Sequence, residues 1–455
     1  MLSSFLLMGK AAMTGNKGQG VIPKFVFPRD RQAIEERLRA AETLEAKRLR
    51  AVEKIIEQVR REGDRALLEL TERFDGIRLQ AGDLRVPPAR LKAAWQALSP
   101  EQRRVLSLAK RRIEAFHRRQ RRRSWTLRDR LGSRLTQRYQ SLACVGVYVP
   151  GFLAALPSTV LMNAVPAKVA GVERLVMVTP PPRNPEAGHA IFAAAHLCGI
   201  NEVYQIGGAQ AIAALAFGTE TIPRVDKVVG PGNIYVTLAK RLLYGRIDID
   251  SMAGPSEILV LADSSANPAF VAADMISQAE HGPDSVAICV HCAGAAFEDR
   301  LVAALEEQIA SAPRRGHIRK SLKANGAIIR TATLDQAIEL ANRRAPEHLA
   351  VMTRRPRQVA ARCRNAGSIF VGPWTPEAIG DYTAGTNHTL PTSGTARFFS
   401  PLSVDDFVRF TNVVEMTARG VARLGPPTIT FAEMEGLFGH AAAVKVRMKV
   451  LGPKR

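Results

Sequence analysis

The sequence predicts an α/β protein with two lobes built on parallel sheets, a helical N-terminal region and a small helical C-terminal tail. Between residues 144 and 371, short apolar runs rich in β-branched residues alternate with longer stretches in which apolar residues recur at helical spacing. Such alternation is typical of parallel α/β folds. The nine apolar runs are too many for one nucleotide-binding sheet, so we expect two lobes.

The N-terminal third has a different texture. From about Arg31 to Arg123 the apolar residues follow helical spacing, and charged residues fill the gaps. Residues 1–25 carry no motif, and the apolar stretch Leu2–Met8 is too short for a secretory signal and has no basic residue before it. We therefore expect a disordered leader over residues 1–25. A mainly helical region over residues 26–143 is expected to pack on the second lobe.

Regular elements then follow one another through the two lobes. The predicted strands are Cys144–Val149, Arg174–Thr179, Val203–Ile206, Lys227–Val229, Glu257–Ala262, Ser285–Val290, Ala327–Ile329, His348–Met352 and Ser368–Val371. The predicted helices include Thr159–Val172, Ala187–Cys198, Ala209–Phe217, Ile234–Leu243 and Ala269–Glu280. These elements define a first lobe over residues 144–255 and a second over residues 256–386. A helical, glycine-punctuated tail over residues 387–455 ends the chain.

The overall charge is strongly basic but does not predict nucleic-acid binding. The chain holds 64 Lys and Arg against 42 Asp and Glu, which gives a formal net charge of +22. The densest run, Arg118–Arg123, lies in a segment of helical periodicity and has aromatic residues only at its flanks, Phe116 and Trp125. Nucleic-acid bases would therefore find no interleaved stacking partners. A solvated helix face, or attraction of an anionic ligand, accounts for the charge instead.

Hydropathy and cysteine usage indicate a soluble protein of a reducing cytoplasm. No apolar stretch reaches the roughly 18 residues that a membrane helix needs, so no membrane contact is expected. Five cysteines are too few and too scattered for a disulfide framework. The spacing Cys289-x-x-Cys292 could bind zinc, but no second such pair exists, and we interpret these two residues as strand-end cysteines.

Two consecutive strand-to-helix turns contain glycines. Gly207-Gly208-Ala209-Gln210 and Gly230-Pro231-Gly232-Asn233 each follow a predicted strand and open a helix. Glycine lets a ligand approach the backbone, and the N-terminus of a helix attracts phosphate. Neither turn has the GxGxxG fingerprint, so a plain tight turn and a nucleotide site are both open at this point.

Two pairs of polar residues in the second lobe are candidates for a site. Gln278 and His281 are three residues apart on a predicted helix and therefore share a face, although glutamine is an uncommon zinc ligand. Glu347 and His348 are adjacent at the start of a predicted strand, where side chains face opposite sides unless the backbone is irregular. Taken alone, each pair is more often structural than functional.

The stretch over residues 378–388 predicts a functional loop. It is glycine-rich, follows the last predicted strand and carries Asp381, Asn387 and His388. In the tail, Glu435 and His440 are five residues apart, a spacing that does not align on a helix, so their role is open. The absence of GxSxG, Walker and HExxH motifs argues against several hydrolase and kinase classes.

Taken together, these motifs resemble the histidinol dehydrogenase family from about residue 30 to the end of the chain. The motifs that carry the resemblance are Val147–Gly151, Pro157–Met162, Gly207–Ile212, Val229–Asn233, Ala253–Glu257, Ser277–Asp284, Ala345–Leu349, Gly380–Tyr382 and Leu390–Thr392. Each is modest alone, but their order and spacing are specific. The resemblance implies two incomplete Rossmann-like lobes.

The resemblance also implies the roles of single residues. The ligands of one Zn²⁺ per subunit correspond to Gln278, His281, Asp381 and His440. The acid/base residues correspond to Glu347 and His348. The substrate contacts correspond to Ser256, Gln278, His281, His348, Asp381, Glu435 and His440, and the NAD contacts to Tyr148, Gln210 and Asn233.

The family reaction is the oxidation of L-histidinol to L-histidine through histidinal, with two NAD and one water, as the last step of histidine biosynthesis. The resemblance implies a homodimer in which the tail of one subunit reaches the active site of the other. Zinc would anchor the substrate rather than take part in redox, because zinc has no accessible redox change. His348 would take the alcohol proton, and Glu347 would activate water for the second oxidation.

The chain departs from the family pattern at three points, and two other functions are alternatives to the one that the resemblance implies. Phe152 stands where the family usually has a glycine, residues 1–25 extend beyond the usual start, and the N-terminal third is unusually basic. One alternative is a paralogous zinc- and NAD-dependent dehydrogenase of another small primary alcohol, which Glu435, His440 and the full zinc set argue against. The other is a basic nucleic-acid-binding protein, which the polar site groups disfavour.

Overall fold

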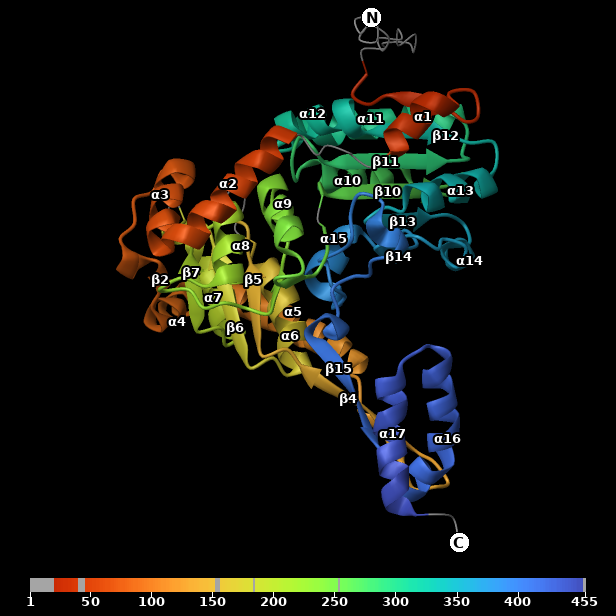
Figure 1. Cartoon of the computed structure of the whole chain (residues 1–455). Coiled ribbons are helices and arrows are strands. Elements are labelled where there is room, and N and C mark those ends of the chain that lie inside the picture. Colours follow the sequence, from red (N-terminus) through yellow and green to blue (C-terminus); the bar gives the residue numbers. More distant parts are fainter. Residues whose placement is uncertain (1–19, 40–45, 152–155, 183–184, 253, 453–455) are drawn as a thin grey trace, which may run out of the picture. The chain divides into compact units, whose positions relative to one another are not determined.

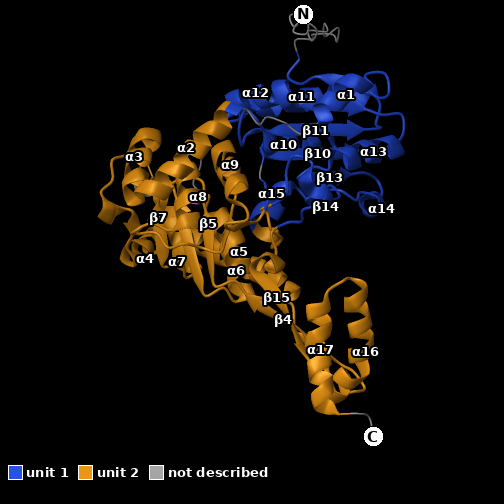
Figure 2. Cartoon of the chain, viewed as in Figure 1, with its two compact units in different colours: residues 1–46, 251–382, 390–401 blue, residues 47–250, 383–389, 402–455 orange. Residues whose placement is uncertain are grey.

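The computed structural model describes residues 20–39, 46–151, 156–182, 185–252 and 254–452. The chain forms two compact units that alternate along the sequence (Figure 2). Unit 1 comprises residues 1–46, 251–382 and 390–401, and unit 2 comprises residues 47–250, 383–389 and 402–455. Among the described residues, no helix is both long and apolar enough to cross a membrane. Residues 1–19 of the expected leader and Phe152 lie outside the described residues.

Unit 1 is built on a six-stranded parallel sheet in the order β1-β12-β11-β10-β13-β14 (Figure 1). The strands are β1 (Lys24–Val26), β10 (Glu257–Ala262), β11 (Val286–His291), β12 (Ala327–Arg330), β13 (His348–Met352) and β14 (Ser368–Val371). The helices are α1 (Arg31–Leu38), α10 (Pro268–Ala279), α11 (Ala295–Ser311), α12 (Arg315–Asn325), α13 (Leu334–Arg344), α14 (Pro356–Ala360) and α15 (Glu377–Ile379).

Both faces of the unit 1 sheet are covered by helices. Along β10, Ile258 and Val260 pack in a core with residues of α10, α11 and α12, whereas Leu259 and Leu261 pack in a second core with residues of α1, α13 and α14. A strand that is buried on both faces reads as a continuous apolar run rather than an alternating one. For this reason β10 and β13 have the bounds that the sequence predicts.

Unit 2 has a second six-stranded sheet, in the order β2-β7-β6-β5-β8-β9, in which only β2 is antiparallel to its neighbour. The strands are β2 (Arg85–Val86), β5 (Cys144–Tyr148), β6 (Arg174–Thr179), β7 (Glu202–Gln205), β8 (Lys227–Val229) and β9 (Asp248–Ile249). One core contains residues of α4 (Pro88–Ala97), α5 (Pro100–His117), α6 (Pro157–Ala170) and α7 (Pro185–Leu197). The other contains residues of α2 (Ala46–Glu62), α3 (Asp64–Asp75), α8 (Gly208–Phe217) and α9 (Ile234–Leu243).

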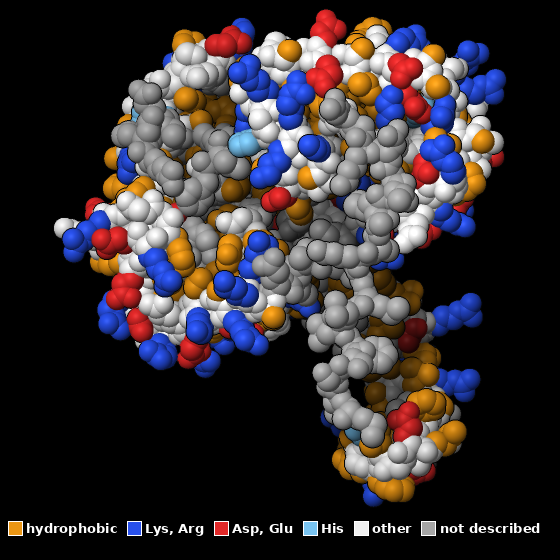
Figure 3. Space-filling model, turned by 90° about the horizontal axis from the view of Figure 1, so that it is seen from above, with side chains coloured by type: hydrophobic (Ala, Val, Ile, Leu, Met, Phe, Trp, Pro, Cys, Tyr) orange, Lys and Arg blue, Asp and Glu red, His pale blue; other side chains and the backbone are white. Residues whose placement is uncertain are grey.

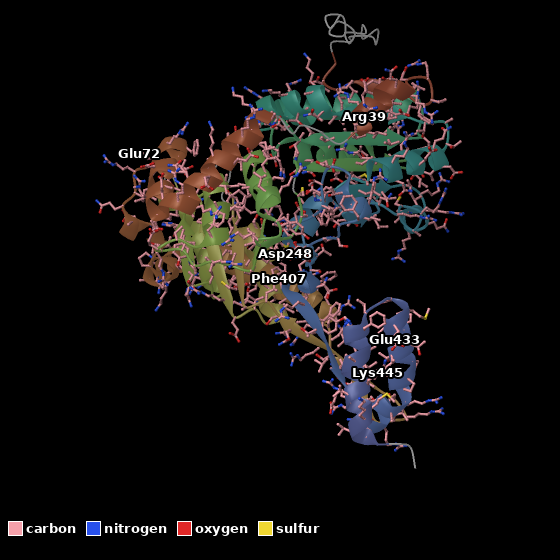
Figure 4. All side chains as sticks on the ribbon, in the orientation of Figure 1. Arg39, Glu72, Asp248, Phe407, Glu433 and Lys445 are labelled. Atoms are coloured by element: carbon pink, nitrogen blue, oxygen red, sulfur yellow. The ribbon has the colours of Figure 1, made fainter. Side chains whose placement is uncertain are left out.

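The rest of unit 2 is an antiparallel sheet and a helical hairpin. The sheet order is β15-β4-β3, from strands β3 (Trp125–Arg128), β4 (Arg134–Ser141) and β15 (Val408–Glu415). The hairpin consists of α16 (Ala418–Met434) and α17 (Phe438–Leu451). The two helices approach closely because Gly425 has no side chain: an added Cβ would lie 2.5 Å from Met448 Sδ. Lys445 and Glu433 form an ion pair between the helices (labelled in Figure 4).

These observations confirm the predicted α/β class with parallel sheets and a helical tail, but the units differ from the expected boundaries. Residues 47–143 belong to the unit of the first lobe, not the second, because Leu91 and Ile113 are buried in the same core as Val147. Residues 20–39 join the second lobe instead. There β1 begins at Lys24, inside the expected leader, and pairs with β12; a strand of three residues is too short to give a periodic signal.

The antiparallel sheet of unit 2 was not predicted from the sequence. One of its strands, β15, lies within the tail that was expected to be helical. All four residues of β3 and six of the eight residues of β15 are exposed. Without a buried face, such strands lack the apolar alternation on which strand prediction depends. On the face of the molecule shown in Figure 3, Lys and Arg side chains are distributed among acidic and apolar ones.

Candidate active site

Glu347 and His348 lie at the amino end of β13, and one residue of the neighbouring strand contacts both. The N–H of Glu257, the first residue of β10, donates to Glu347 Oε2 at 2.8 Å. His348 Nδ1 lies 3.0 Å from the carbonyl oxygen of Glu257. Because a carbonyl oxygen only accepts hydrogen bonds, His348 Nδ1 carries a proton and donates it. The second ring nitrogen, Nε2, is then the atom available for proton transfer.

A local irregularity of the backbone brings these adjacent side chains together. Ala345 adopts the left-handed region with φ +50° and is followed by Pro346, so Glu347 lies in a turn and β13 begins only at His348. Glu347 and His348 are both buried. The alternation rule for regular strands, which argues against a joint site, therefore does not apply to this pair.

His348 also faces two further carboxylates. Its Nε2 lies 3.6 Å from Asp381 Oδ1 and 3.9 Å from Glu377 Oε1. Among the described residues, these three side chains form a group whose ligand atoms lie within 4.8 Å of one another. Asp381 lies in a π-helical segment, Gly380–Ala384, an irregularity that is frequent at functional sites. The Ser277 hydroxyl donates to Glu377 Oε2 at 2.8 Å and connects this group to α10.

Gln278 lies in the last turn of α10, whereas His281 follows two residues after the helix ends at Ala279, so the two do not share a helix as the sequence predicts. Asn267 caps the start of this helix by accepting the N–H of Ala269, and Pro268 occupies its first position. Gln278 is completely buried, and neither atom of its amide has a hydrogen-bond partner among the described residues. His281 Nδ1 lies 3.5 Å from Ser256 Oγ.

The electrostatics of this cluster are dominated by buried carboxyl groups. Burial raises the pKa of Glu347 to about 8, an effect that His348 opposes and Asp381 reinforces. Burial and Asp381 likewise raise the pKa of Glu377 to about 8 against the opposing effect of His348. Burial lowers the pKa of His348, but Glu347, Asp381 and Glu377 outweigh it and raise this pKa to about 9. Three carboxyl groups thus surround one histidine, which can neutralise only one of them. A bound cation would reduce the remaining repulsion between their negative charges.

These residues fit a divalent metal ion. A buried amide without partners costs free energy, and both amide atoms of Gln278 lack a hydrogen-bond partner among the described residues. Burial lowers the pKa of His281 and favours the neutral imidazole that a metal needs, although Asp381 acts in the opposite direction. Nitrogen and oxygen donors of this kind suit zinc.

The three residues predicted to contact a nucleotide lie at the turns of unit 2. Tyr148 ends β5, and its hydroxyl accepts the N–H of Gly208 at 3.1 Å, in the turn that opens α8. Gln210 is buried in the first turn of α8. Asn233 caps α9, where its Oδ1 accepts the N–H groups of Tyr235 and Val236.

Tyr148 lies at the point where the strand order of the unit 2 sheet reverses. β5 has β6 on one side and β8 on the other, so the connections after β5 and after β8 run to opposite sides. In open parallel sheets, ligands bind beyond the carboxyl ends of strands at this point. The turn after β8 is anchored there, because Asp250 accepts the N–H of Gly230 at 2.7 Å and Lys240 donates to the Gly230 carbonyl at 2.9 Å.

Glu435 and His440 lie at one end of the α16–α17 hairpin. Glu435 follows the last residue of α16, and His440 is in the first turn of α17. Both side chains are exposed. They belong to unit 2, whereas Ser256, Gln278, His281 and Asp381 belong to unit 1.

Comparison with known proteins decides the family. The sequence model of the family described as "Histidinol dehydrogenase" matches residues 38–448, most of the chain. The chain belongs to the histidinol dehydrogenase family. Histidinol dehydrogenase of Syntrophotalea carbinolica is 50% identical over 398 residues, which cover 88% of this chain and 92% of that protein. Histidinol dehydrogenase of Prochlorococcus marinus is 46% identical over 426 residues, 92% of this chain and 96% of that protein.

A solved structure agrees with the sequence matches. The crystal structure of histidinol dehydrogenase from Elizabethkingia anophelis aligns with a TM-score of 0.88 at 36% identity, over 96% of this chain and 100% of that chain. The resemblance that the motifs indicate is therefore confirmed, and this member of the histidinol dehydrogenase family is an oxidoreductase.

Sequence reasoning missed three buried residues around Glu347 and His348: Glu257, Arg344 and Glu377. Glu257 and Arg344 read as ordinary ends of a strand and a helix, and only the folded chain brings them together. Glu377 carried a weak signal, because an acidic residue between Pro376 and the Gly380-Asp381 motif opens a short helix. None of the three could be assigned without tertiary contacts.

A glycine-to-alanine change in the turn after β8 tests the predicted NAD site of unit 2. Gly230 has φ +112°, and an added Cβ would overlap the carbonyl oxygen of Tyr148. We expect Gly230→Ala to raise the KM for NAD by about tenfold or more, a cost of about 1.4 kcal/mol in binding. Gly245→Ala is the matched control, because Gly245 also has a positive φ (+95°) but no atom within 4 Å of its added Cβ. Equal KM values for NAD in the two variants would contradict this expectation.

Asp274, one turn before Gln278, predicts a pH-dependent contribution to stability. Burial raises its pKa to about 7, and its Oδ2 has no hydrogen-bond partner among the described residues. The folded state then holds a proton that the unfolded state releases at about pH 4, so this carboxyl lowers stability as pH rises from about 4 to about 7. The free energy of unfolding of Asp274→Asn, relative to that of wild type, should therefore increase by about 2 kcal/mol from about pH 5 to pH 8. Urea unfolding of both proteins at these two pH values measures the difference; a constant difference would contradict it.

Proposed function

We propose that this enzyme oxidises L-histidinol to L-histidine through histidinal, with two NAD and one zinc ion per subunit, as the last step of histidine biosynthesis. The observation that carries the proposal is the buried pair Glu347 and His348, held by the main chain of Glu257 beside Asp381. An acid/base pair next to a set of metal donors suits the oxidation of an alcohol followed by that of an aldehyde.

The zinc ligands in this proposal are Gln278, His281 and Asp381, with His440 of the partner subunit as the fourth. Three side chains fit because the amide of Gln278 is buried without partners, His281 has a lowered pKa, and Asp381 lies among competing carboxyl groups. When bound, zinc supplies a Lewis acid that orients the imidazole and amine of the substrate. Ser256, 3.5 Å from His281, and Glu435 complete the proposed substrate contacts.

His348 is the proposed proton acceptor of the first oxidation. Its Nδ1–H is fixed on the carbonyl of Glu257, which directs Nε2 toward the reacting hydroxyl. Nε2 acts in the neutral form of the imidazole, which the surrounding carboxyl groups disfavour. In this form Nε2 takes the proton of the alcohol O–H, and the C–H bond gives its hydride to NAD, so histidinol loses two electrons and becomes the aldehyde.

Glu347 is the proposed base of the second oxidation. Its buried carboxyl, with a pKa of about 8, exchanges a proton near neutral pH. Glu347 takes a proton from water as the water oxygen attacks the aldehyde carbon, and the resulting hydrate gives a second hydride to a second NAD.

The proposed NAD site comprises Tyr148, Gln210 and Asn233. Support comes from the position of Tyr148 where the strand order of the sheet reverses and from the two glycine turns that open α8 and α9. Burial raises the pKa of Tyr148 to about 12, so its hydroxyl keeps its proton and can also donate to a ligand.

We propose a homodimer with shared active sites, in a reducing cytoplasm. The hairpin exposes large apolar side chains, among them Phe431 (64%), Met434 (79%) and Phe438 (69%), on either side of Glu435. A cluster of large, exposed apolar side chains often marks a contact with another protein chain. All five cysteines are free thiols, as expected where disulfides are rare.

Subunit mixing tests the shared site. His281→Ala and His440→Ala should each be inactive alone, because each loses a zinc ligand. A mixed dimer would regain one intact site, in which the His440→Ala subunit receives the normal His440 of its partner. Activity that returns only after the two inactive proteins are dissociated and reassociated together supports the proposal. No recovery in mixed dimers of verified composition would contradict it.

Zinc removal tests the reaction. NADH formation from L-histidinol should stop when zinc is chelated and return when zinc is restored. Measured absorbance at the NADH band, together with metal analysis of the same samples, gives the result. Activity that persists after complete removal of zinc would refute the metal part of the proposal.

A further inference from the structure

Glu257 contacts both acid/base residues with its main chain while its side chain is held by two other segments. Its Oε1 accepts the N–H of Ser393 at 2.8 Å, and its Oε2 accepts a hydrogen bond from the guanidinium of Arg344. Glu257 is 1% exposed and Arg344 is 5% exposed. The position of the Glu257 peptide groups, and hence of the atoms that bind Glu347 and His348, depends on how this buried ion pair is seated.

Arg344 extends the network to the end of α1. Its Nη1 donates to the carbonyl of Arg39 at 2.9 Å and to that of Leu38 at 3.2 Å (Arg39 is labelled in Figure 4). The rigid fork of a guanidinium can satisfy such acceptors together with the carboxylate, which the single ammonium group of lysine cannot do with the same geometry. Arg344 is also the last residue of α13, so it directly precedes the turn that carries Glu347.

Backbone strain marks the same network. In the described part of the chain, the non-glycine residues with positive φ are Ala345 (+50°) and Ser393 (+55°). Ala345 follows Arg344, and the N–H of Ser393 donates to Glu257. Such conformations cost free energy and persist where surrounding contacts enforce them. Both strained residues therefore adjoin the pair that contacts the proposed catalytic residues.

We propose that Glu257 and Arg344 are a positioning pair for Glu347 and His348 in histidinol oxidation, an inference that rests on the proposed function. Neither residue touches the substrate in this account. Arg344 fixes the carboxylate of Glu257, and the Glu257 peptide groups fix the carboxylate of Glu347 and the ring of His348.

A purely stabilising role explains this arrangement less well. A buried ion pair contributes little stability compared with apolar residues of the same volume, because both charges lose their hydration. Fixing geometry is a role that apolar residues could not take over, since only the charged fork joins Glu257, Leu38 and Arg39. A displacement of about 1 Å at a reacting group can lower turnover about 10²-fold.

Arg344→Met tests the pair, with Arg343→Met as the matched control. Methionine removes the hydrogen bonds but keeps an unbranched side chain of similar length. Arg343 precedes Arg344 at the same helix end, but it pairs with Glu35 at a half-exposed site and has no contact with Glu257. In the zinc-loaded enzyme we expect Arg344→Met to lower kcat about 10–100-fold while the KM for histidinol and the zinc content stay unchanged. Arg344→Lys should recover part of kcat, and Arg343→Met should behave as wild type.

A second variant keeps the test decisive if Arg344→Met folds poorly. Glu257→Gln/Arg344→Met removes both charges and leaves no unpaired buried ion. It should recover the thermal stability of wild type but keep the low kcat. Wild-type kcat in this double variant, or a kcat loss in Arg344→Met that is matched by lost zinc and raised KM, would overturn the positioning role.

Crystal structures of the zinc-loaded wild type and both single variants provide a readout that needs no substrate. The distance between His348 Nδ1 and the Glu257 carbonyl, 3.0 Å in the wild type, should lengthen in Arg344→Met and stay unchanged in Arg343→Met. An unchanged distance in both variants overturns the positioning pair. If the distance lengthens in Arg344→Met but the wild-type enzyme is inactive with histidinol, the proposed substrate is overturned and the positioning pair is not.

Discussion

Replacing His348 with asparagine is expected to lower the turnover of histidinol by about 10²–10⁴-fold, the range typical for loss of a positioned acid/base group. Asparagine retains an amide N–H that can donate to the Glu257 carbonyl, as His348 Nδ1 does. It has no atom that accepts a proton at neutral pH. The buried contacts should therefore survive while the proton transfer is lost.

The measurement is the steady-state rate of NADH formation in His348→Asn at saturating histidinol and NAD. His317→Asn is the matched control, because His317 is an exposed histidine of α12 in the same unit. Zinc analysis of each variant must show that the metal is retained, since His348 is not among the proposed ligands. A His348→Asn enzyme with wild-type turnover would contradict the assignment of His348 as proton acceptor.

Replacing Asp381 with alanine is expected to weaken zinc binding by about 100-fold or more and to lower activity by a similar factor. Asp381 supplies the one carboxylate of the proposed ligand set, and its Oδ1 lies 3.6 Å from His348 Nε2. Its loss removes charge that attracts a cation and leaves Gln278 and His281 as the remaining ligands from the same subunit.

Metal analysis after dialysis against a zinc buffer measures the Asp381→Ala effect, alongside NADH formation at saturating zinc. Asp335→Ala serves as control, because Asp335 is an exposed carboxylate of the same unit that pairs with Arg362. Activity that returns to wild type at high zinc would fit a weakened metal site. Full zinc content in Asp381→Ala, with or without activity, would show that Asp381 is not a ligand.

The sequence predicted the sheets best where strands are buried on both faces. Arg174–Thr179 and Glu257–Ala262 have the predicted bounds, because every position except Arg174 is buried and every residue after the charged first one is apolar or β-branched. β3 and β15 went undetected because they form an exposed antiparallel sheet. Their pairing partners, rather than their own composition, determine their conformation.

The sequence indicated the candidate site residues but not the contacts between them. The spacing of Gln278 and His281 indicated a shared helix face, but α10 ends at Ala279, before His281. Only the resemblance to a family makes that pair candidate metal ligands. Glu347 and His348 were visible as a motif, but the left-handed turn at Ala345 that unites them was not. The contacts of Glu257 with Arg344 and Ser393 join residues 87 and 136 positions apart, and no local pattern reports such pairs.

The central claim is a four-electron oxidation at one site, and the ratio of NADH formed to histidinol consumed tests it most directly. Limiting L-histidinol is incubated to completion with excess NAD and the zinc-loaded enzyme, and NADH and histidine are both quantified. The proposed reaction yields two NADH and one histidine for each histidinol, without release of free aldehyde. One NADH per histidinol with accumulation of histidinal, or no NADH from a folded, zinc-loaded enzyme, would contradict it.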